Sequence, residues 1–142
     1  MTTEKPSKHT LARAGEHRVL SELIIRGYEP FSAENDKGID IILRNGLKVD
    51  VKAIIGSVHH MKVTPRSPGN RTYSYDNMEY AFQIHKTQRD KEIDFYIAWI
   101  AELDEFYIIP SKALTKSDQQ KVYPNNPEHR YSQYKAAWHL LK

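Results

Sequence analysis

Hydrophobic residues recur every three or four positions in two stretches of the chain, and this spacing predicts two amphipathic helices. The first covers residues 7–27, where Gly27 supplies a stop signal, and the second covers residues 131–142 at the end of the chain. Residues 111–116 suggest a short additional helix.

Strand-forming residues are concentrated between the two long helices. Runs rich in β-branched and aromatic side chains predict strands over residues 28–33, 38–44, 47–55, 94–101 and 106–110. Residues 76–91 are ambiguous, because the alternation over 80–85 fits a strand while a helix fits nearly as well. This order predicts one α/β domain over residues 1–142, with a central mixed β-sheet flanked by helices.

The two strands on either side of Asn45 and Gly46 have a register that the hydrophobic pattern decides. A two-residue loop would place every apolar residue of one strand opposite a charged residue of the other. A three-residue loop, with Gly46 in the left-handed conformation, places Ile41 opposite Val49 and makes one face continuously apolar. The sequence therefore predicts the three-residue loop.

The same register brings two acids together on the other face of this hairpin. Asp40 lies opposite Asp50, with Cβ atoms roughly 4.5–5.5 Å apart, and Lys52 shares their face. Two carboxylates this close repel one another unless a cation lies between them. Carboxylates and a backbone carbonyl are the hard ligands that magnesium prefers. The alternative interpretation is a polar sheet face held by cross-strand ion pairs.

Glu16 is an acid on the apolar side of the first helix. At about 100° per residue it falls at the centre of the stripe that Val19, Leu20 and Leu23 help to form. A carboxylate that faces a core is costly unless it is paired with a base or coordinates a metal. The sequence leaves both roles open, as a structural ion pair or as a metal ligand.

Residues 56–76 form a basic segment in a chain whose net charge is a modest +3. The segment holds Lys62, Arg66 and Arg71 and no acidic residue before its end, and its prolines and glycine predict a loop. A basic loop attracts phosphates, and a neighbouring Tyr73 is suited to stack on unpaired bases. These four residues are the candidate nucleic-acid contacts, and the alternative is an exposed loop that binds nothing.

The composition is that of a globular protein and excludes several classes. Of 142 residues, 39% are hydrophobic and 27% are charged, close to globular averages. No apolar run approaches the roughly 18 residues that a membrane span needs, and the first residues lack the apolar core of a signal peptide. Because there is no cysteine, disulfides and thiolate metal sites are excluded. We therefore expect a cytoplasmic protein without a membrane partner.

The acids and the lysine occur in an order that resembles a known family. Three segments resemble the motif of the PD-(D/E)XK nuclease superfamily, which includes restriction-type endonucleases and Holliday-junction resolvases: Gly15-Glu16, Gly38-Ile39-Asp40 and Val49-Asp50-Val51-Lys52. The likeness covers residues 12–55, and Ile39 stands where the motif often has proline. The resemblance implies a restriction-endonuclease-like core.

By this resemblance, Glu16, Asp40, Asp50 and the backbone carbonyl of Val51 would bind magnesium or manganese. Lys52 would orient the attacking water and stabilise negative charge on the phosphate. The implied activity is a magnesium-dependent endodeoxyribonuclease that hydrolyses phosphodiester bonds in DNA, with branched or junction DNA among the candidate substrates. Many members act as dimers, so a homodimer is the expected assembly.

Other interpretations of the same residues stay open. A catalytically inactive nucleic-acid-binding or assembly module would share the fold, although a pure binder has no need of clustered acids that face phosphate. A ribonuclease or tRNA-directed enzyme would use the same chemistry, and the sequence does not separate DNA from RNA. A structural ion-pair network without a nucleic-acid partner is the third alternative.

Overall fold

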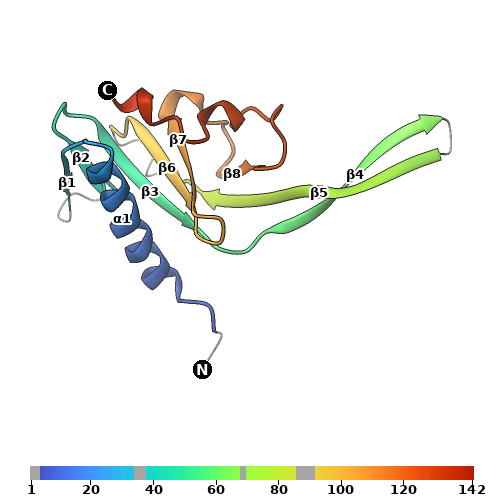
Figure 1. Ribbon diagram of the computed structural model, residues 1–142, viewed down its shortest axis with the longest axis horizontal. Helices are drawn as coiled ribbons and strands as arrows, with labels where there is room; N and C mark the ends of the chain where they lie inside the picture. Colours follow the sequence, from blue (N-terminus) through green and yellow to red (C-terminus); the bar gives the residue numbers. More distant parts are fainter. Residues whose placement is uncertain (1–3, 34–37, 68–69, 86–91) are drawn as a thin grey trace.

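One long helix and two β-sheets make up the fold (Figure 1). The computed structural model describes residues 4–33, 38–67, 70–85 and 92–142, with the backbone alone for residues 58–77. The helix packs on one face of a five-stranded sheet, and a three-stranded sheet lies against the other face. None of the helices in the described ranges is long and apolar enough to cross a membrane.

The five-stranded sheet is mixed, as predicted. Its strands lie in the order β1-β2-β3-β6-β7, where β3 and β6 are parallel and the other neighbours are antiparallel. The strand bounds are β1 (Pro30–Ser32), β2 (Ile41–Leu43), β3 (Lys48–Ile54), β6 (Phe95–Ile100) and β7 (Glu105–Pro110). The predicted α/β fold with a central mixed sheet is confirmed.

The β2–β3 hairpin has the register that the hydrophobic pattern predicts. Ile41 pairs with Val49, and the amide of Leu43 donates to the carbonyl of Leu47 at 2.9 Å. Gly46 has a φ of +91°, the left-handed conformation that the three-residue loop requires. The two apolar strands therefore share one buried face.

Helix α1 (Lys8–Ile25) begins and ends at residues suited to those positions. The Ser7 hydroxyl accepts a hydrogen bond from the Thr10 amide at 3.2 Å, and so satisfies one of the amides that a helix start leaves free. Gly27 follows the helix with a φ of +89°, as a left-handed cap does.

The buried stripe of α1 differs from the predicted one. Gly15, Val19 and Leu23 are buried, whereas Glu16 is half-buried beside this stripe rather than at its centre. The reason is close packing: a Cβ built on Gly15 would lie 2.8 Å from the Cβ of Ala53 on β3. The glycine lets the helix approach the sheet, and this approach turns the helix about its axis.

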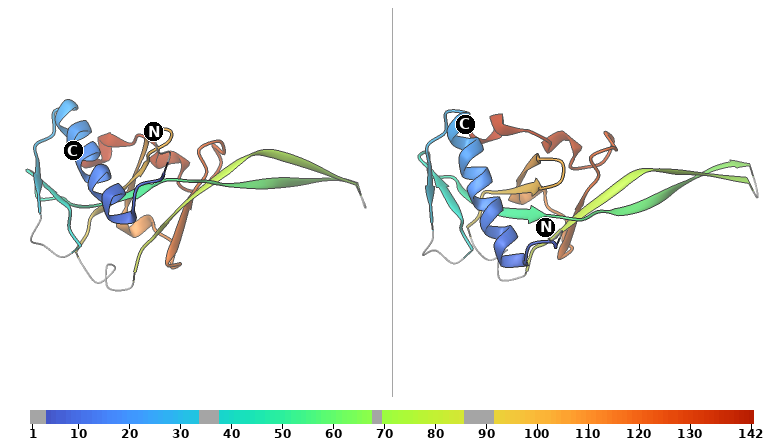
Figure 2. Two further views of the ribbon diagram at one scale, coloured as in Figure 1. Left: turned by 90° about the horizontal axis from the view of Figure 1, so that it is seen from below. Right: turned by 60° about the horizontal axis from the view of Figure 1, so that its bottom comes forward.

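Residues 56–76 do not form the predicted loop. They contribute β4 (Val58–Ser67) and the first half of β5 (Asn70–Gln83), which pair antiparallel. The two strands leave the body as a long two-stranded ribbon, the arm (residues 58–67 and 70–77), visible in Figures 1 and 2. Pro65 lies next to an irregularity in the pairing, where a missing amide is tolerated.

The ambiguous segment 76–91 is a strand as far as Gln83, the last residue of β5. Residues Tyr80 to Gln83 pair with β8 (Gln119–Val122), which completes the three-stranded sheet in the order β4-β5-β8. Tyr80, Phe82 and Val122 are buried against the five-stranded sheet. The helix that fitted residues 76–91 nearly as well is therefore absent from the described part of that segment.

The predicted C-terminal helix is wrong. Residues 131–142 form two 3₁₀ turns, η2 (Ser132–Tyr134) and η3 (Trp138–Leu141), separated by Ala136 with a φ of +53°. The Ala136 amide donates to the carbonyl of Phe106 on β7 at 2.8 Å instead of continuing a helix. Pairing with the sheet thus overrides the local helical pattern, and a single long helix flanks the sheet. The short helix expected over 111–116 is the 3₁₀ turn η1 (Ser111–Ala113).

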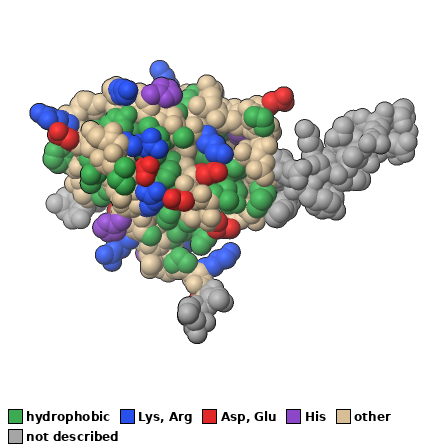
Figure 3. Space-filling view, viewed as in Figure 1, with side chains coloured by type: hydrophobic (Ala, Val, Ile, Leu, Met, Phe, Trp, Pro, Cys, Tyr) green, Lys and Arg blue, Asp and Glu red, His purple; other side chains and the backbone are tan. Residues whose placement is uncertain are grey.

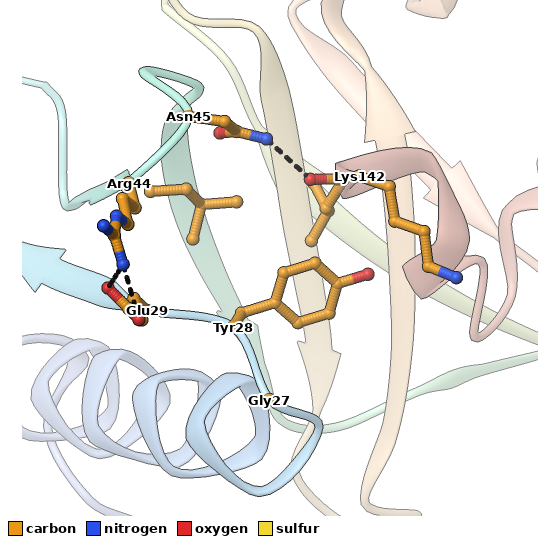
Figure 4. Close-up of a pocket in the computed structure, with 8 residues that line it drawn as sticks. Gly27, Tyr28, Glu29, Arg44, Asn45 and Lys142 are labelled. Atoms are coloured by element: carbon orange, nitrogen blue, oxygen red, sulfur yellow. Dashed lines mark hydrogen bonds and ion pairs between the residues drawn. The ribbon is translucent and has the colours of Figure 1, made fainter.

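Side chains from the hairpin side of the molecule hold this C-terminal segment. The Tyr28 hydroxyl donates to the carbonyl of Trp138 at 2.6 Å, and Asn45 Nδ2 donates to the carbonyl of Leu141 at 3.0 Å. Figure 4 shows the pocket of about 470 Å³ that they line, with the Glu29–Arg44 ion pair at its side. These contacts hold the C-terminal segment against the hairpin. None of the predicted catalytic acids takes part in them.

Acidic and basic side chains are mixed on the face that Figure 3 shows, among the side chains that are described. Ion pairs also join α1 to the rest of the fold and to itself: Arg18 pairs with Asp104 at 2.9 Å and with Glu22 at 3.0 Å. Pairs near the surface contribute little to stability.

Gly15→Ala is expected to destabilise the protein by about 1–2 kcal/mol, measured by chemical denaturation. The cost is the clash with Ala53, which outweighs a gain in helix propensity of about 1 kcal/mol. Ala53→Gly removes the clashing group, so the double variant should lose less stability than the two single variants together. Wild-type stability in Gly15→Ala would contradict the close approach of α1.

Candidate active site

Asp50 and Lys52 lie on the face of β3 that turns away from α1. Val49 and Val51 point toward the α1 side, so the alternation of a strand directs Asp50 and Lys52 to the opposite face. Asp50 is 3% exposed, and its Oδ2 lies 3.2 Å from Nζ of Lys52. A buried carboxyl therefore has a cation beside it.

Asp40 joins this pair from the residue before β2. Its Oδ2 accepts a hydrogen bond from the Val51 amide at 2.7 Å. The amide and carbonyl of one strand residue point to the same edge, so the Val51 carbonyl also lies on the Asp40 side of β3. The site thus combines two carboxyl groups, one ammonium group and one main-chain carbonyl at the point where β2 begins.

The electrostatics of the site centre on Asp50. Burial raises the pKa of Asp50 to about 8, the Lys52 ammonium opposes this shift, and the Asp40 carboxylate adds to it. The two carboxyl groups are close enough to share a hydrogen bond, which requires a proton on one of them. Without a further cation, Asp50 therefore carries that proton at neutral pH.

A divalent cation fits this arrangement chemically. Asp50 Oδ2 is buried and accepts no well-directed hydrogen bond, although the Lys52 ammonium lies near it. Within the described parts of the chain, no three His, Asp or Glu side chains are grouped so that they would hold a metal together. Magnesium binds through as few as one or two carboxylates and keeps several waters, so Asp40, Asp50 and the Val51 carbonyl suffice.

The structure places Glu16 differently from the other three predicted catalytic residues. Glu16 is half-buried on α1, next to Gly15, which contacts Ala53. Ala53 belongs to the set of β3 side chains on the α1 side, whereas Asp50 and Lys52 belong to the other set. Asp40, Asp50 and Lys52 are therefore brought together, and Glu16 belongs to the helix that packs on the opposite face of the sheet.

The predicted nucleic-acid contacts lie along the arm. Lys62 pairs with Ser74, Tyr73 with Val63, and Arg71 with Pro65, while Arg66 falls at the irregularity before Ser67. Their side chains are outside the described part of the structure. The backbone shows that these residues belong to a ribbon that projects from the body (Figure 1).

Sequence reasoning passed over a polar pocket between β8 and the C-terminal segment. It is lined in part by Lys121, His129 and Arg130. These residues are separated in the sequence by Pro124 and Pro127 and form no recognisable motif. A local excess of basic residues near position 130 is the one signal that would have pointed to it.

Asp50→Asn should stabilise the protein increasingly as the pH rises from 5 to 8. The folded protein holds the Asp50 proton up to about pH 8, whereas the unfolded chain releases it near 3.8. The folded state therefore binds more protons in this range, and wild-type stability falls as the pH rises. One pKa unit corresponds to about 1.4 kcal/mol, and the difference at pH 8 should exceed this value.

The free energy of unfolding is measured by thermal or chemical denaturation in EDTA. Asp104→Asn is the control, and the effect of this substitution on stability should change with pH in the opposite direction. Hydrogen bonds from Arg18 and Trp99 lower the pKa of Asp104, so its charged form stabilises the fold above its unfolded pKa. The control should lose stability at neutral pH and regain it toward low pH. A stability difference for Asp50→Asn that does not change with pH would contradict the raised pKa.

Comparison with known proteins supports a nuclease-like fold. No family model matches the chain, and no curated protein matches it. The structure is similar to that of a bacterial homing endonuclease, I-Ssp6803I, with a TM-score of 0.67 and 17% sequence identity. The match covers 96% of this chain and 92% of that chain. The chain therefore has the fold of a bacterial homing endonuclease along nearly its whole length.

Proposed function

We propose that this protein is a metal-dependent endonuclease that hydrolyses phosphodiester bonds in DNA. The observation that carries the proposal is the buried Asp50 carboxyl, held beside Asp40 and Lys52 at the start of the β2–β3 hairpin. A buried acid with a raised pKa is costly, and such groups cluster at functional sites. The likeness to a homing endonuclease fold agrees with this chemistry.

Asp40, Asp50 and the Val51 carbonyl would hold magnesium or manganese. The ion would supply positive charge and Lewis acidity where negative charge develops on the phosphate. Because the ion favours the charged carboxylate, its binding would displace the proton that Asp50 otherwise holds. Glu16, on the α1 side of the sheet, would contribute less than either aspartate.

Lys52 has a separate role in this proposal. Its ammonium is half-buried, lies 3.2 Å from Asp50 Oδ2, and is directed to the same face as both acids. A fixed positive charge in a partly desolvated site stabilises negative charge on the phosphate more strongly than a mobile one in water. We infer that Lys52 also orients the attacking water, as the resemblance implies.

The arm would bind the DNA duplex. A two-stranded β-ribbon fits the major groove of B-form DNA, which is about 12 Å wide. The major groove of A-form RNA is deep and narrow and does not admit such an element, so the ribbon favours DNA over RNA. Lys62, Arg66 and Arg71 would supply the charges that meet phosphates, with Tyr73 beside them.

Asp50→Asn and Lys52→Ala should each reduce DNA cleavage by about 100-fold or more, because each removes a charge on which the transition state depends. Cleavage of linear, nicked, branched and single-stranded DNA is measured with magnesium, with manganese and with EDTA. Asp104→Asn and Lys112→Ala are matched exposed controls that should cut like the wild type. Glu16→Gln should lose less activity than Asp50→Asn.

Two results would overturn the enzymatic proposal. The first is a wild-type protein that cuts none of these substrates with either metal. The second is an Asp50→Asn variant that cuts as fast as the wild type. Binding of DNA without cleavage would instead favour the inactive binding module.

Replacing Lys62, Arg66 and Arg71 together by alanine should weaken DNA binding and reduce its salt dependence. Each lost phosphate contact lowers the slope of log affinity against log salt by about 0.9. Fluorescence anisotropy in EDTA measures both quantities without cleavage. The control replaces Arg13, Lys112 and Lys142, which are exposed on the body. Equal losses in the two triple variants would show that net charge, and not the arm, attracts DNA.

A further inference from the structure

A second polar pocket, of about 400 Å³, lies between β8 and the chain that follows it. Its lining supplies two basic side chains and a histidine but, among the described residues, no aspartate or glutamate. The residues with polar groups at its rim are Ser117, Gln119, Lys121, Tyr123, His129 and Arg130. A pocket rich in donors and without an acid in its wall is suited to an anion.

The floor of this pocket is fixed by a buried amide. Gln120 is 1% exposed, and its Oε1 accepts hydrogen bonds from Thr115 Oγ1 at 3.0 Å and from the Tyr131 hydroxyl. Its Nε2 donates to the carbonyls of Thr115 at 3.2 Å and Ser117 at 2.7 Å. A fully hydrogen-bonded amide holds the wall in one arrangement before a ligand arrives.

One neutral side chain in the lining, His129, has the position of its hydrogen fixed by another contact. His129 Nδ1 accepts from the Tyr131 amide at 3.3 Å, so neutral His129 carries its hydrogen on Nε2. Burial and the nearby Arg130 charge lower the pKa of His129 and favour this neutral form. Ser117 Oγ accepts from the Gln119 amide at 3.2 Å, which fixes the turn that leads into β8.

The positive charge of the pocket comes mainly from Arg130. Lys121 forms an ion pair with the buried Glu79 at 3.1 Å, and the Tyr123 hydroxyl also binds Glu79 at 2.7 Å. Glu79 therefore offsets Lys121 from behind the pocket. Arg130 is exposed, and its guanidinium matches the geometry of phosphate oxygens.

The pocket lies at the root of the arm. Strand β8 pairs with residues Tyr80 to Gln83 of β5, the same strand that continues outward into the arm. In Figures 1 and 2 the chain after β8 lies beside the place where the arm leaves the body. A duplex that runs along the arm would come near β8, whose residues Gln119, Gln120 and Lys121 line the pocket.

We propose that this pocket binds one backbone phosphate of the nucleic acid that lies along the arm, through Arg130 and His129. The inference rests on the proposed function, since it takes the arm as the nucleic-acid-binding element. It adds a contact outside both the acid pair and the arm. The pocket would fix how the duplex enters the body.

Arg130→Ala tests this proposal by fluorescence anisotropy with a labelled DNA duplex in EDTA at several salt concentrations. We expect a several-fold loss of affinity and a slope of log affinity against log salt that falls by about 0.9, the value for one phosphate. Gln119→Glu, which places a carboxylate at the rim, should weaken binding further. Arg13→Ala and Ser21→Glu make the same charge changes on exposed positions of α1 and should bind like the wild type.

The outcomes separate this proposal from the proposed function. If the wild type binds DNA while Arg130→Ala and Gln119→Glu bind equally well, the pocket proposal is overturned and the endonuclease proposal stands. If inorganic phosphate at constant ionic strength shifts the His129 ring resonances while both variants keep full DNA affinity, the pocket takes free phosphate instead of a strand, which also overturns it. If the wild type binds no DNA, both proposals fail.

Discussion

The contact between a buried carboxyl and its charged neighbours is the constraint on which the active site depends. Asp50 is nearly inaccessible to water, yet its neighbours are another acid and a lysine. In this setting the charged form of Asp50 needs more compensation than Lys52 supplies, so the carboxyl keeps its proton. A second cation would release that proton and let both acids act as ligands. In the function proposed here, a metal ion would supply the positive charge that the site lacks.

The rest of the fold holds that contact in place from both faces of one strand. On one face, Gly15 lets α1 lie directly against Ala53 of β3. On the other face, the three-stranded sheet packs against the five-stranded sheet, and burial raises the pKa of Asp50 on this same face. The same three-stranded sheet extends outward as the arm (Figure 1). One sheet thus packs on the face that carries the chemical groups and, in the function proposed here, also binds the substrate.

The parts of the structure that the sequence predicts correctly depend on residues that are close together in the chain. The β2–β3 register follows from Ile41, Val49 and Gly46, because a one-residue slip would expose every apolar side chain. The placement of Asp50 and Lys52 on one face, opposite Asp40, follows from that register. The site was therefore predictable as far as it is built from a single hairpin.

The wrong predictions depend on contacts between distant segments. The 131–142 helix fails because the Ala136 amide pairs with Phe106, about thirty positions earlier. The basic loop is a ribbon because residues 58–67 and 70–83 pair with each other, and their prolines concealed this pairing. The sequence did not predict the position of Glu16, because α1 packs closely on the sheet at Gly15. A hydrophobic pattern does not indicate how closely a helix backbone approaches a sheet.

Manganese binding, measured by calorimetry in two buffers of different ionisation enthalpy, tests the central claim most directly. At pH 7 the wild type should bind one ion and release close to one proton, since the pKa of Asp50 is about 8 before the metal binds. The Asp50→Asn variant should bind far more weakly and release no proton. Binding without proton release, or equal affinity in the two proteins, would contradict the account.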